Sequence, residues 1–154
     1  MSITGWYCVK TIKTFTEDRT MAEVTPDEYI AMITKRYEGA PELQRELMQA
    51  KMTAFAKILI SEDGMIKTYS PVPDGIDEAQ KAEAIKAGYE FTEDGYFRPN
   101  PKEGKAWKEE NGEFLYDSGI QGQVMGENQS SWKSLEFDGS TVKMSEGLVT
   151  YEKV

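Results

Sequence analysis

The protein has 154 residues, of which 39% are hydrophobic, and its formal net charge is -9 at pH 7. This length suits a single domain that buries about two-thirds of its unfolded surface. The excess of Asp and Glu argues against nucleic acid or an anionic membrane as partner, because both attract concentrated Lys and Arg. The N-terminus lacks the basic start and apolar run of a secretory signal, and polar residues interrupt every later apolar stretch. We therefore expect a cytoplasmic protein without membrane insertion.

The chain contains one cysteine, Cys8, and no histidine. One cysteine cannot form an internal disulfide, and the lack of histidine removes the commonest general base and the commonest metal ligand. We interpret Cys8 as a small thiol packed on a strand. The composition predicts no metal site, no cofactor and no catalytic residues of a recognisable pattern.

Residues 4–15 are predicted to form the strand around which the fold is organised, paired with the last strand at residues 148–154. Apolar side chains occur on both faces of the first strand, with Trp6, Cys8 and Ile12 on one and Tyr7, Val9 and Phe15 on the other. Such a strand suits a position between a barrel interior and a covering helix.

Two helices are predicted after a short edge strand at residues 21–24. Thr25-Pro26-Asp27-Glu28 combines an N-cap, a proline at the first helical position and the glutamate of a capping box. The first helix should therefore run from residue 26 to about 38, before Gly39 as a left-handed cap. The second should run from residue 41 to about 51. Their apolar stripes predict a helical hairpin.

The remaining chain is predicted to be an antiparallel meander. Residues 55–60 and 65–69 flank an Asp-Gly turn, and Asp-Gly or Asn-Gly recurs at 94–95, 111–112 and 138–139. A short helix is expected at residues 77–87. We predict a mainly β fold in which residues 1–154 form one closed, up-and-down antiparallel barrel of about eight to ten strands. An open α+β sheet is the alternative.

The motif Trp6-Tyr7-Cys8-Val9 resembles the Trp-Tyr signature in the first strand of lipocalins, although Gly5 stands one residue closer to the tryptophan. The order of strand, helix pair and meander is similar to that of fatty-acid-binding proteins, and residues 149–154 look like their closing strand. The resemblance is therefore to the calycin superfamily. It implies binding of a small apolar or amphipathic molecule in a barrel cavity, with the physiological ligand unknown.

One departure from this resemblance concerns the last strand. Fatty-acid-binding proteins commonly carry an Arg two residues before the Tyr of that strand, and the Arg holds the ligand carboxylate. This chain keeps Tyr151 but has Val149 at the Arg position. A buried carboxylate needs a compensating cation, so fatty-acid binding would require another inward cation. The resemblance also implies that Trp6 stacks against a basic side chain such as Lys153.

Candidate ligand-binding residues are aromatic side chains on separate predicted strands, together with basic residues that could meet a negative ligand group. Small-molecule cavities combine apolar walls with a few polar anchors, and Tyr and Trp supply both. The alternative interpretation is ordinary packing of aromatic rings in strands. The candidates are Tyr69, Tyr116, Trp132 and Tyr151, with Arg98 or Lys133 as the cation.

Two other functions stay open at this point, although we favour a binding protein over an enzyme. A cofactor-free barrel enzyme of the phenolic acid decarboxylase type would need a Tyr, an Arg and a carboxylate close together in a cavity. A packed barrel with a structural or protein-interaction role would need a filled interior and an exposed apolar patch. Ligand identity, oligomeric state and pathway are left open by the sequence.

Overall fold

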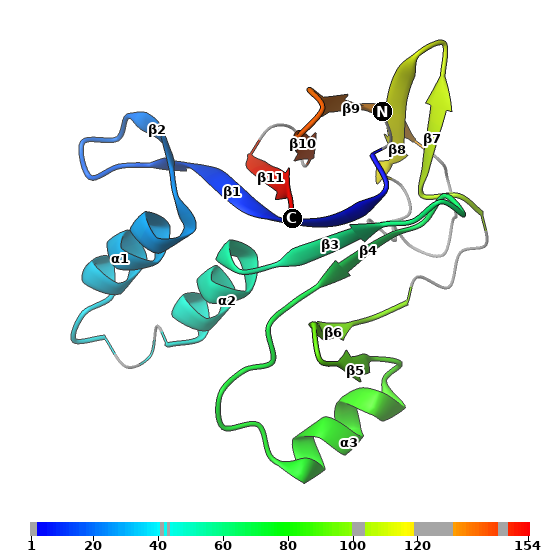
Figure 1. The fold of residues 1–154 in the computed structure, drawn as a ribbon. Coiled ribbons are helices and arrows are strands. Elements are labelled where there is room, and N and C mark those ends of the chain that lie inside the picture. The colour runs from blue at the N-terminus through cyan, green and yellow to red at the C-terminus, as the bar shows by residue number, and fades with distance from the viewer. Residues whose placement is uncertain (1–2, 41, 43, 100–103, 119–130, 145–147) are drawn as a thin grey trace.

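The structure is a computed structural model that describes residues 3–40, 42, 44–99, 104–118, 131–144 and 148–154 (Figure 1). Its helices are α1 (Pro26–Arg36), α2 (Gln44–Ala54) and α3 (Glu78–Lys86). Its strands are β1 (Gly5–Phe15), β2 (Met21–Val24), β3 (Lys57–Ile60), β4 (Ile66–Tyr69), β5 (Glu90–Thr92), β6 (Gly95–Phe97), β7 (Trp107–Glu110), β8 (Glu113–Asp117), β9 (Trp132–Phe137), β10 (Thr141–Met144) and β11 (Val149–Lys153).

The main sheet curls into a nearly closed antiparallel barrel of eight strands. Their order is β4-β3-β1-β11-β10-β9-β8-β7, and β2 pairs with β1 beside this path. The strands thus follow one another around the barrel as in an up-and-down meander. The predicted mainly β barrel, with a helical hairpin and one further short helix, is confirmed.

The long first strand holds the sheet together because it pairs along both edges. The last strand, β11, lies along one edge, with Tyr7 opposite Lys153 and Ile12 opposite Val149. On the other edge, β3 pairs with the N-terminal half of β1 and β2 with its C-terminal half. The predicted pairing of the first and last strands is therefore confirmed.

A β-bulge between Val9 and Thr11 changes which side chains of β1 point inward. The extra residue, Lys10, is exposed. One inserted residue reverses the alternation, so Ile12 lies on the inner face with Tyr7 and Val9. The predicted grouping of Ile12 with Trp6 and Cys8, and of Phe15 with Tyr7, was wrong. That prediction assumed strict alternation of side chains, and the extra residue of the bulge reverses the faces of all residues after it.

Between β4 and β7 the barrel is completed by turn contacts instead of a strand ladder. The backbone N–H groups of Ala106 and Trp107 donate to the carbonyl oxygen of Gly64, at 2.6 and 3.0 Å. The indole Nε1 of Trp107 donates to the carbonyl oxygen of Ser61 at 3.0 Å. At the other end of β4, Ser70 and Tyr96 exchange two backbone hydrogen bonds of 2.9 and 2.8 Å, which attach the β5–β6 hairpin.

The helical hairpin begins at the predicted capping box. The N–H of Glu28 donates to the Thr25 hydroxyl at 3.2 Å, while the Glu28 carboxylate accepts from the N–H of Thr25 at 3.4 Å. Helix α2 runs to Ala54 instead of about residue 51, because Ala50 and Ala54 both turn toward the core at helical spacing. None of the described helices has the length and apolar character needed to cross a membrane.

The core occupies the barrel interior and the junction with the helical hairpin. Tyr29 and Ile30 of α1 pack against it. In Figure 1, α1 and α2 lie side by side below β1, whereas α3 lies beyond β5 and β6. The core cluster consists of fourteen buried residues, none of them charged: Ile3, Tyr7, Val9, Ile12, Ala54, Ala56, Ile58, Ile60, Tyr116, Leu135, Val142, Met144, Val149 and Tyr151.

Gly95 allows β6 to approach β4 closely, which gives a test of this attachment. Its φ is +126°, and a Cβ there would overlap the carbonyl oxygen of Ser70. We expect Gly95→Ala to lower the free energy of unfolding by about 3 kcal/mol, through backbone strain plus the lost Ser70–Tyr96 bonds. Urea unfolding measures this change.

The matched control for that substitution is Gly75→Ala. Gly75 also has a positive φ, +81°, but nothing lies within 4 Å of its Cβ position. Only the conformational cost of about 1–2 kcal/mol applies there. Equal losses in the two variants would contradict the proposed attachment of β6 to β4.

Candidate functional site

Three tyrosines bring hydroxyl-bearing rings into the barrel core: Tyr7 on β1, Tyr116 on β8 and Tyr151 on β11. Residues directly opposite one another on paired strands share a face. Tyr7 lies opposite Ile58, and Tyr151 lies opposite Val142; both of these partners are almost completely buried. The buried part of the described inner surface therefore combines aliphatic side chains with tyrosine rings, whereas the exposed Lys133 and Lys153 share this face near the strand ends.

The hydroxyl of Tyr7 is buried without a hydrogen-bond partner in the described part of the chain. The Tyr7 side chain is 0% exposed. Burial raises the pKa of Tyr7, so the group stays a neutral O–H that can both donate and accept. Most buried polar groups in proteins are bonded, because an unbonded one costs about 1–3 kcal/mol. The Tyr7 hydroxyl is thus unbonded among the described residues, within a tightly packed core that leaves no water-sized space beside it.

Tyr69, a predicted site residue, lies on the outer face of the barrel. It stands opposite Lys57, whose neighbour Ile58 points inward. The Tyr69 ring is nevertheless 7% exposed, because it packs against Trp6 and Phe97 with ring centroids 5.2 and 4.6 Å apart. Burial first, then the charges of nearby acidic residues, raises its pKa. The β5–β6 hairpin therefore buries a second aromatic cluster outside the barrel.

Trp132 and Arg98 also lie away from the core. Trp132 is on the outer face of β9, where the Lys108 Nζ lies 4.3 Å from its ring centroid. Arg98 is exposed after β6, with its Nε near Gly88 at the end of α3. Of the five residues predicted to bind ligand, the structure brings only Tyr116 and Tyr151 into the same core.

The two lysines proposed from the sequence lie at the ends of strands. Lys133 is opposite Tyr116 and Lys153 is opposite Tyr7, and both are exposed. The Cε of Lys153 lies 3.0 Å from where Gly5 would carry a Cβ. The described ring contact of Trp6 is with Tyr69, so stacking of Trp6 on Lys153 stays a prediction.

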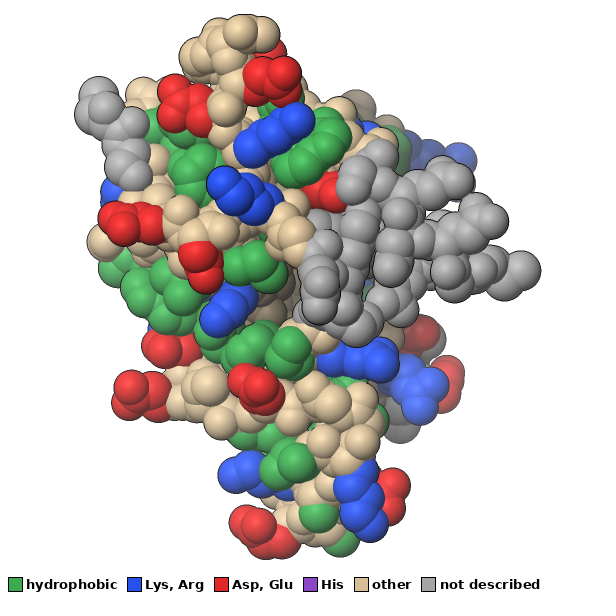
Figure 2. All heavy atoms as spheres, turned by 90° about the vertical axis from the view of Figure 1, so that its right-hand side faces the viewer, with side chains coloured by type: hydrophobic (Ala, Val, Ile, Leu, Met, Phe, Trp, Pro, Cys, Tyr) green, Lys and Arg blue, Asp and Glu red, His purple; other side chains and the backbone are tan. Residues whose placement is uncertain are grey.

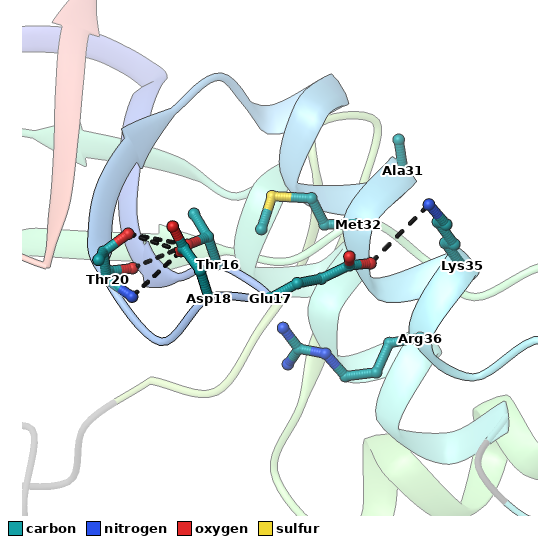
Figure 3. Close-up of a pocket in the computed structure, with 8 residues that line it drawn as sticks. All are labelled: Thr16, Glu17, Asp18, Thr20, Ala31, Met32, Lys35 and Arg36. Carbon is teal, nitrogen blue, oxygen red and sulfur yellow. Dashed lines mark hydrogen bonds and ion pairs between the residues drawn. The ribbon is translucent and has the colours of Figure 1, made fainter.

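A surface pocket of about 700 Å³ lies between the β1–β2 turn and α1 (Figure 3). The Asp18 carboxylate in its wall accepts hydrogen bonds from the hydroxyls of Thr16 and Thr20. These bonds lower the pKa of Asp18. The lining residues are Thr16, Glu17, Asp18, Thr20, Ala31, Met32, Lys35 and Arg36.

The other charges of this pocket also meet groups of the protein. Lys35 Nζ lies 3.8 Å from Glu17, and Arg36 donates to the carbonyl oxygen of Phe15 at 3.4 Å. Figure 3 shows Glu17 and Lys35 reaching toward each other across the pocket. These polar groups bond to one another or to the backbone. We therefore interpret the pocket as the contact region between the β1–β2 turn and α1, and not as a ligand site.

Outside the barrel, the described surface gives little indication of a binding site. In Figure 2, small groups of hydrophobic side chains lie among Lys, Arg, Asp and Glu over the described part of the drawn face. Among the residues placed by the structure, no three His, Cys, Asp or Glu side chains cluster as metal ligands would. The feature that stands out among the described residues is therefore the unbonded Tyr7 hydroxyl in the packed barrel interior.

No protein-family model, curated protein or solved structure gives a significant match to the chain. Membership of the calycin superfamily therefore stays a prediction from the residues that resemble it. The candidate site is argued from its own geometry.

Tyr7 was missed as a site residue although the sequence placed it on the predicted central strand. An aromatic residue in a strand is ordinary, and nothing in its neighbours along the chain indicates whether its hydroxyl will find a partner. Its burial comes from Ile58 on β3 and from the other barrel strands. The only hint in the sequence was that Tyr7 and Val9 alternate onto the same face of the predicted strand.

The buried tyrosines predict that stability falls at high pH. Burial raises the pKa of Tyr7 and Tyr151 above the ordinary value of 10.0. In the unfolded chain these groups ionise first, so their contribution is complete below pH 10 and is lost as pH rises through the folded pKa. We expect the free energy of unfolding to fall above pH 10 by up to about 1.4 kcal/mol per pH unit for each tyrosine.

Urea unfolding of wild type and Tyr151→Phe between pH 9 and pH 11.5 measures this effect. The difference between the two slopes isolates Tyr151 from the lysines, which titrate in both proteins. A smaller slope is expected for Tyr151→Phe. Identical slopes would mean that the Tyr151 ring is not held away from water.

Proposed function

We propose that the protein binds a small, largely apolar molecule inside the β-barrel, with the hydroxyl of Tyr7 as its polar contact. One observation carries this proposal: the Tyr7 hydroxyl is buried and has no hydrogen-bond partner among the described residues. Few apolar walls in proteins enclose an unbonded hydroxyl, because its loss of hydration is costly. A hydrogen bond to a bound molecule would remove that cost.

The surroundings of Tyr7 support this function. Small-molecule sites are mostly apolar, with a few polar groups that fix orientation. Here Ile58, Val142 and Leu135 supply aliphatic surface, while Tyr116 and Tyr151 supply further hydroxyl-bearing rings in the same core. Sequence resemblance to calycin barrels points to the same kind of function.

Binding at Tyr7 requires the core to rearrange as well as to open, since the Tyr7 side chain is 0% exposed and no water-sized space adjoins its hydroxyl. The side between β4 and β7 is the best candidate. There the described contacts are the hydrogen bonds of Ala106 and Trp107 to Gly64 and of Trp107 to Ser61, instead of a continuous ladder. Segments held by few hydrogen bonds open at lower free energy than the rest of a protein. Exchange of the bound molecule should therefore take place through this side of the barrel.

The function is tested by comparing Tyr7→Phe with wild type in two preparations. One is the protein as purified; the other is unfolded in guanidinium, extracted with organic solvent and refolded. With ligand bound, Tyr7→Phe loses a hydrogen bond and should lower the free energy of unfolding by about 1 kcal/mol. After extraction it removes an unbonded hydroxyl and should raise that free energy by about 1–3 kcal/mol.

Native mass spectrometry of the purified wild type provides the second readout. A bound small molecule is expected that disappears after extraction. No adduct, together with a stability gain from Tyr7→Phe in both preparations, would contradict the proposed function. Tyr89→Phe is the matched control, because Tyr89 lies next to β5, outside the barrel, with its ring against Tyr96.

A decarboxylase-type enzyme is less well supported by the same geometry. Such a site needs a Tyr, an Arg and a carboxylate together. Arg98 is exposed beside Gly88, and the buried carboxylate of Asp117 already accepts a hydrogen bond from the N–H of Ser131 at 2.8 Å. The described residues therefore do not assemble that set around Tyr116 or Tyr151.

A protein-interaction role is the second candidate, and one observation favours it. Phe15 and Met21 lie opposite each other on β1 and β2, and both are more than half exposed. Leu148, whose carbonyl oxygen accepts from the N–H of Lys13, is also exposed. This role requires no molecule inside the barrel. Tyr7→Phe would then raise the free energy of unfolding in both the purified and the extracted protein.

A further inference from the structure

We infer that Asn111 is a site of spontaneous deamidation, at which the side-chain amide leaves as ammonia and aspartate or isoaspartate takes its place. Water is the only other reactant. This inference is independent of the proposed function. It follows from the geometry of the turn between β7 and β8, and from how that turn differs from the Asp-Gly turns elsewhere in the described chain.

Asn111 and Gly112, the only Asn-Gly pair in the sequence, form the two-residue turn between Glu110 of β7 and Glu113 of β8. Both turn residues have a positive φ, +54° for Asn111 and +80° for Gly112, which is typical of the type I′ turn of a tight hairpin. Both are exposed. Figure 1 shows this turn at the tip of the hairpin, clear of the other described strands and helices. The pair is therefore open to water.

The reaction begins at the backbone nitrogen of Gly112. After this N–H loses its proton to hydroxide, the nitrogen attacks the Asn111 Cγ, so that an N–Cγ bond forms and the Cγ–Nδ2 bond breaks with release of ammonia. Water then opens the resulting succinimide ring. Cleavage of the N–Cγ bond gives aspartate, and cleavage of the bond to the backbone carbonyl carbon gives isoaspartate. A glycine at the second position favours ring closure because it has no side chain to hinder the attack.

Both reacting groups are free within the described part of the chain. The Asn111 side chain makes no hydrogen bond there, and the Gly112 N–H donates to no described carbonyl oxygen. Apart from its neighbours in the chain, nothing lies within 4 Å of the position that a Cβ on Gly112 would occupy. The nitrogen can therefore lose its proton to solvent, and the side chain can turn toward it without breaking another contact.

Three of the Asp-Gly turns hold their carboxylates in place. The Asp63 carboxylate accepts hydrogen bonds from a hydroxyl and an N–H of its own turn, and so does that of Asp138. Asp94 lies 3.9 Å from the Lys57 Nζ. A side chain held in this way must give up its partners before it can reach the following backbone nitrogen. The carboxamide of Asn111 has no such partner among the described residues.

The pair Asp74-Gly75 is a matched comparison within the same molecule. Gly75 has a φ of +81°, and nothing lies within 4 Å of its Cβ position, as at Gly112. Asp74 is exposed, like Asn111. Its side chain is a carboxylate, however, which is ionised at neutral pH and resists attack by a nucleophile. The two pairs therefore differ in the group that must leave and not in the space around it.

Deamidation changes the hairpin in two ways. Either product adds a negative charge beside Glu110 and Glu113, which already lie opposite each other, and like charges directly opposite destabilise a strand pair. Isoaspartate also adds one atom to the backbone of a two-residue turn, and loop length fixes the register of a hairpin. We therefore expect isoaspartate to weaken the pairing of β7 with β8 more than aspartate does.

The test incubates the protein at neutral and at mildly alkaline pH, both folded in buffer and unfolded in guanidinium, and follows each peptide by mass spectrometry. A protease that cleaves before aspartate but not before isoaspartate separates the two products. In the folded protein, product at position 111 should form at least about tenfold faster than isoaspartate at Asp63, Asp74 or Asp138. Since the tip of a hairpin opens at little cost, its rate should lie within about tenfold of the rate in guanidinium.

The control variant is Asn111→Asp, because aspartate also tolerates a positive φ but has no amide to lose as ammonia. This variant should show no mass change at position 111. It has the same charge as the isoaspartate form but an ordinary backbone. Its midpoint of urea unfolding should therefore be the higher of the two.

The outcomes decide two separate points. Product that forms less than about tenfold faster than at Asp74, or that folding slows by more than about tenfold, would overturn the modification site. Equal urea midpoints for the isoaspartate form and Asn111→Asp would overturn the effect on the hairpin and leave the site standing. Neither result bears on the binding proposed at Tyr7.

Discussion

Pairing along both edges of β1 is the constraint on which the rest of the structure depends. An eleven-residue strand is long enough to hold β3 and β2 in succession on one edge and β11 on the other. The bulge at Lys10 keeps the middle of this strand apolar toward the barrel, because it brings Ile12 to the side of Tyr7 and Val9. Without the bulge, Ile12 would point outward and the polar Thr11 and Lys13 would point inward.

The polar groups of the turns show how consistently the described chain satisfies hydrogen bonds. Asp138 accepts from the Thr141 hydroxyl at 2.6 Å and from the N–H groups of Thr141 and Ser140 at 2.7 and 2.9 Å, and these bonds hold the pKa of Asp138 far below its ordinary value. Asp63 performs the same task in the β3–β4 turn. Against this background, the unbonded hydroxyl of Tyr7 stands apart, and the proposed function rests on it.

Much of the fold could be predicted because its signals are local. The capping box at Thr25, the Asp-Gly turns and the apolar first and last strands each depend on residues close together in the chain. The end of α2 at Ala54 and the inward position of Ile12 could not be predicted, because core contacts extend the helix and an inserted residue alters the strand. Both effects are set by pairing partners distant in sequence.

The candidate site was harder to predict than the fold, for a related reason. Tyr69 and Trp132 have the same strand context as Tyr116 and Tyr151, yet the first two lie outside the barrel and the second two inside. The β5–β6 hairpin covers Tyr69 on the outer face of the barrel. A buried aromatic residue in this protein is therefore not always one that points into the barrel. Which side faces the interior is decided by register, and register is known only once the strands are paired.

The most direct test of the account is a high-resolution crystal structure of the protein as purified, without extraction, examined around the Tyr7 hydroxyl. The account predicts continuous density for a molecule larger than water, with an oxygen or nitrogen atom about 2.6–3.0 Å from that hydroxyl. It further predicts aliphatic or aromatic atoms of the molecule against the barrel wall. A hydroxyl bonded to a lone water or to a protein group, in a fully packed interior, would contradict a ligand site in this barrel.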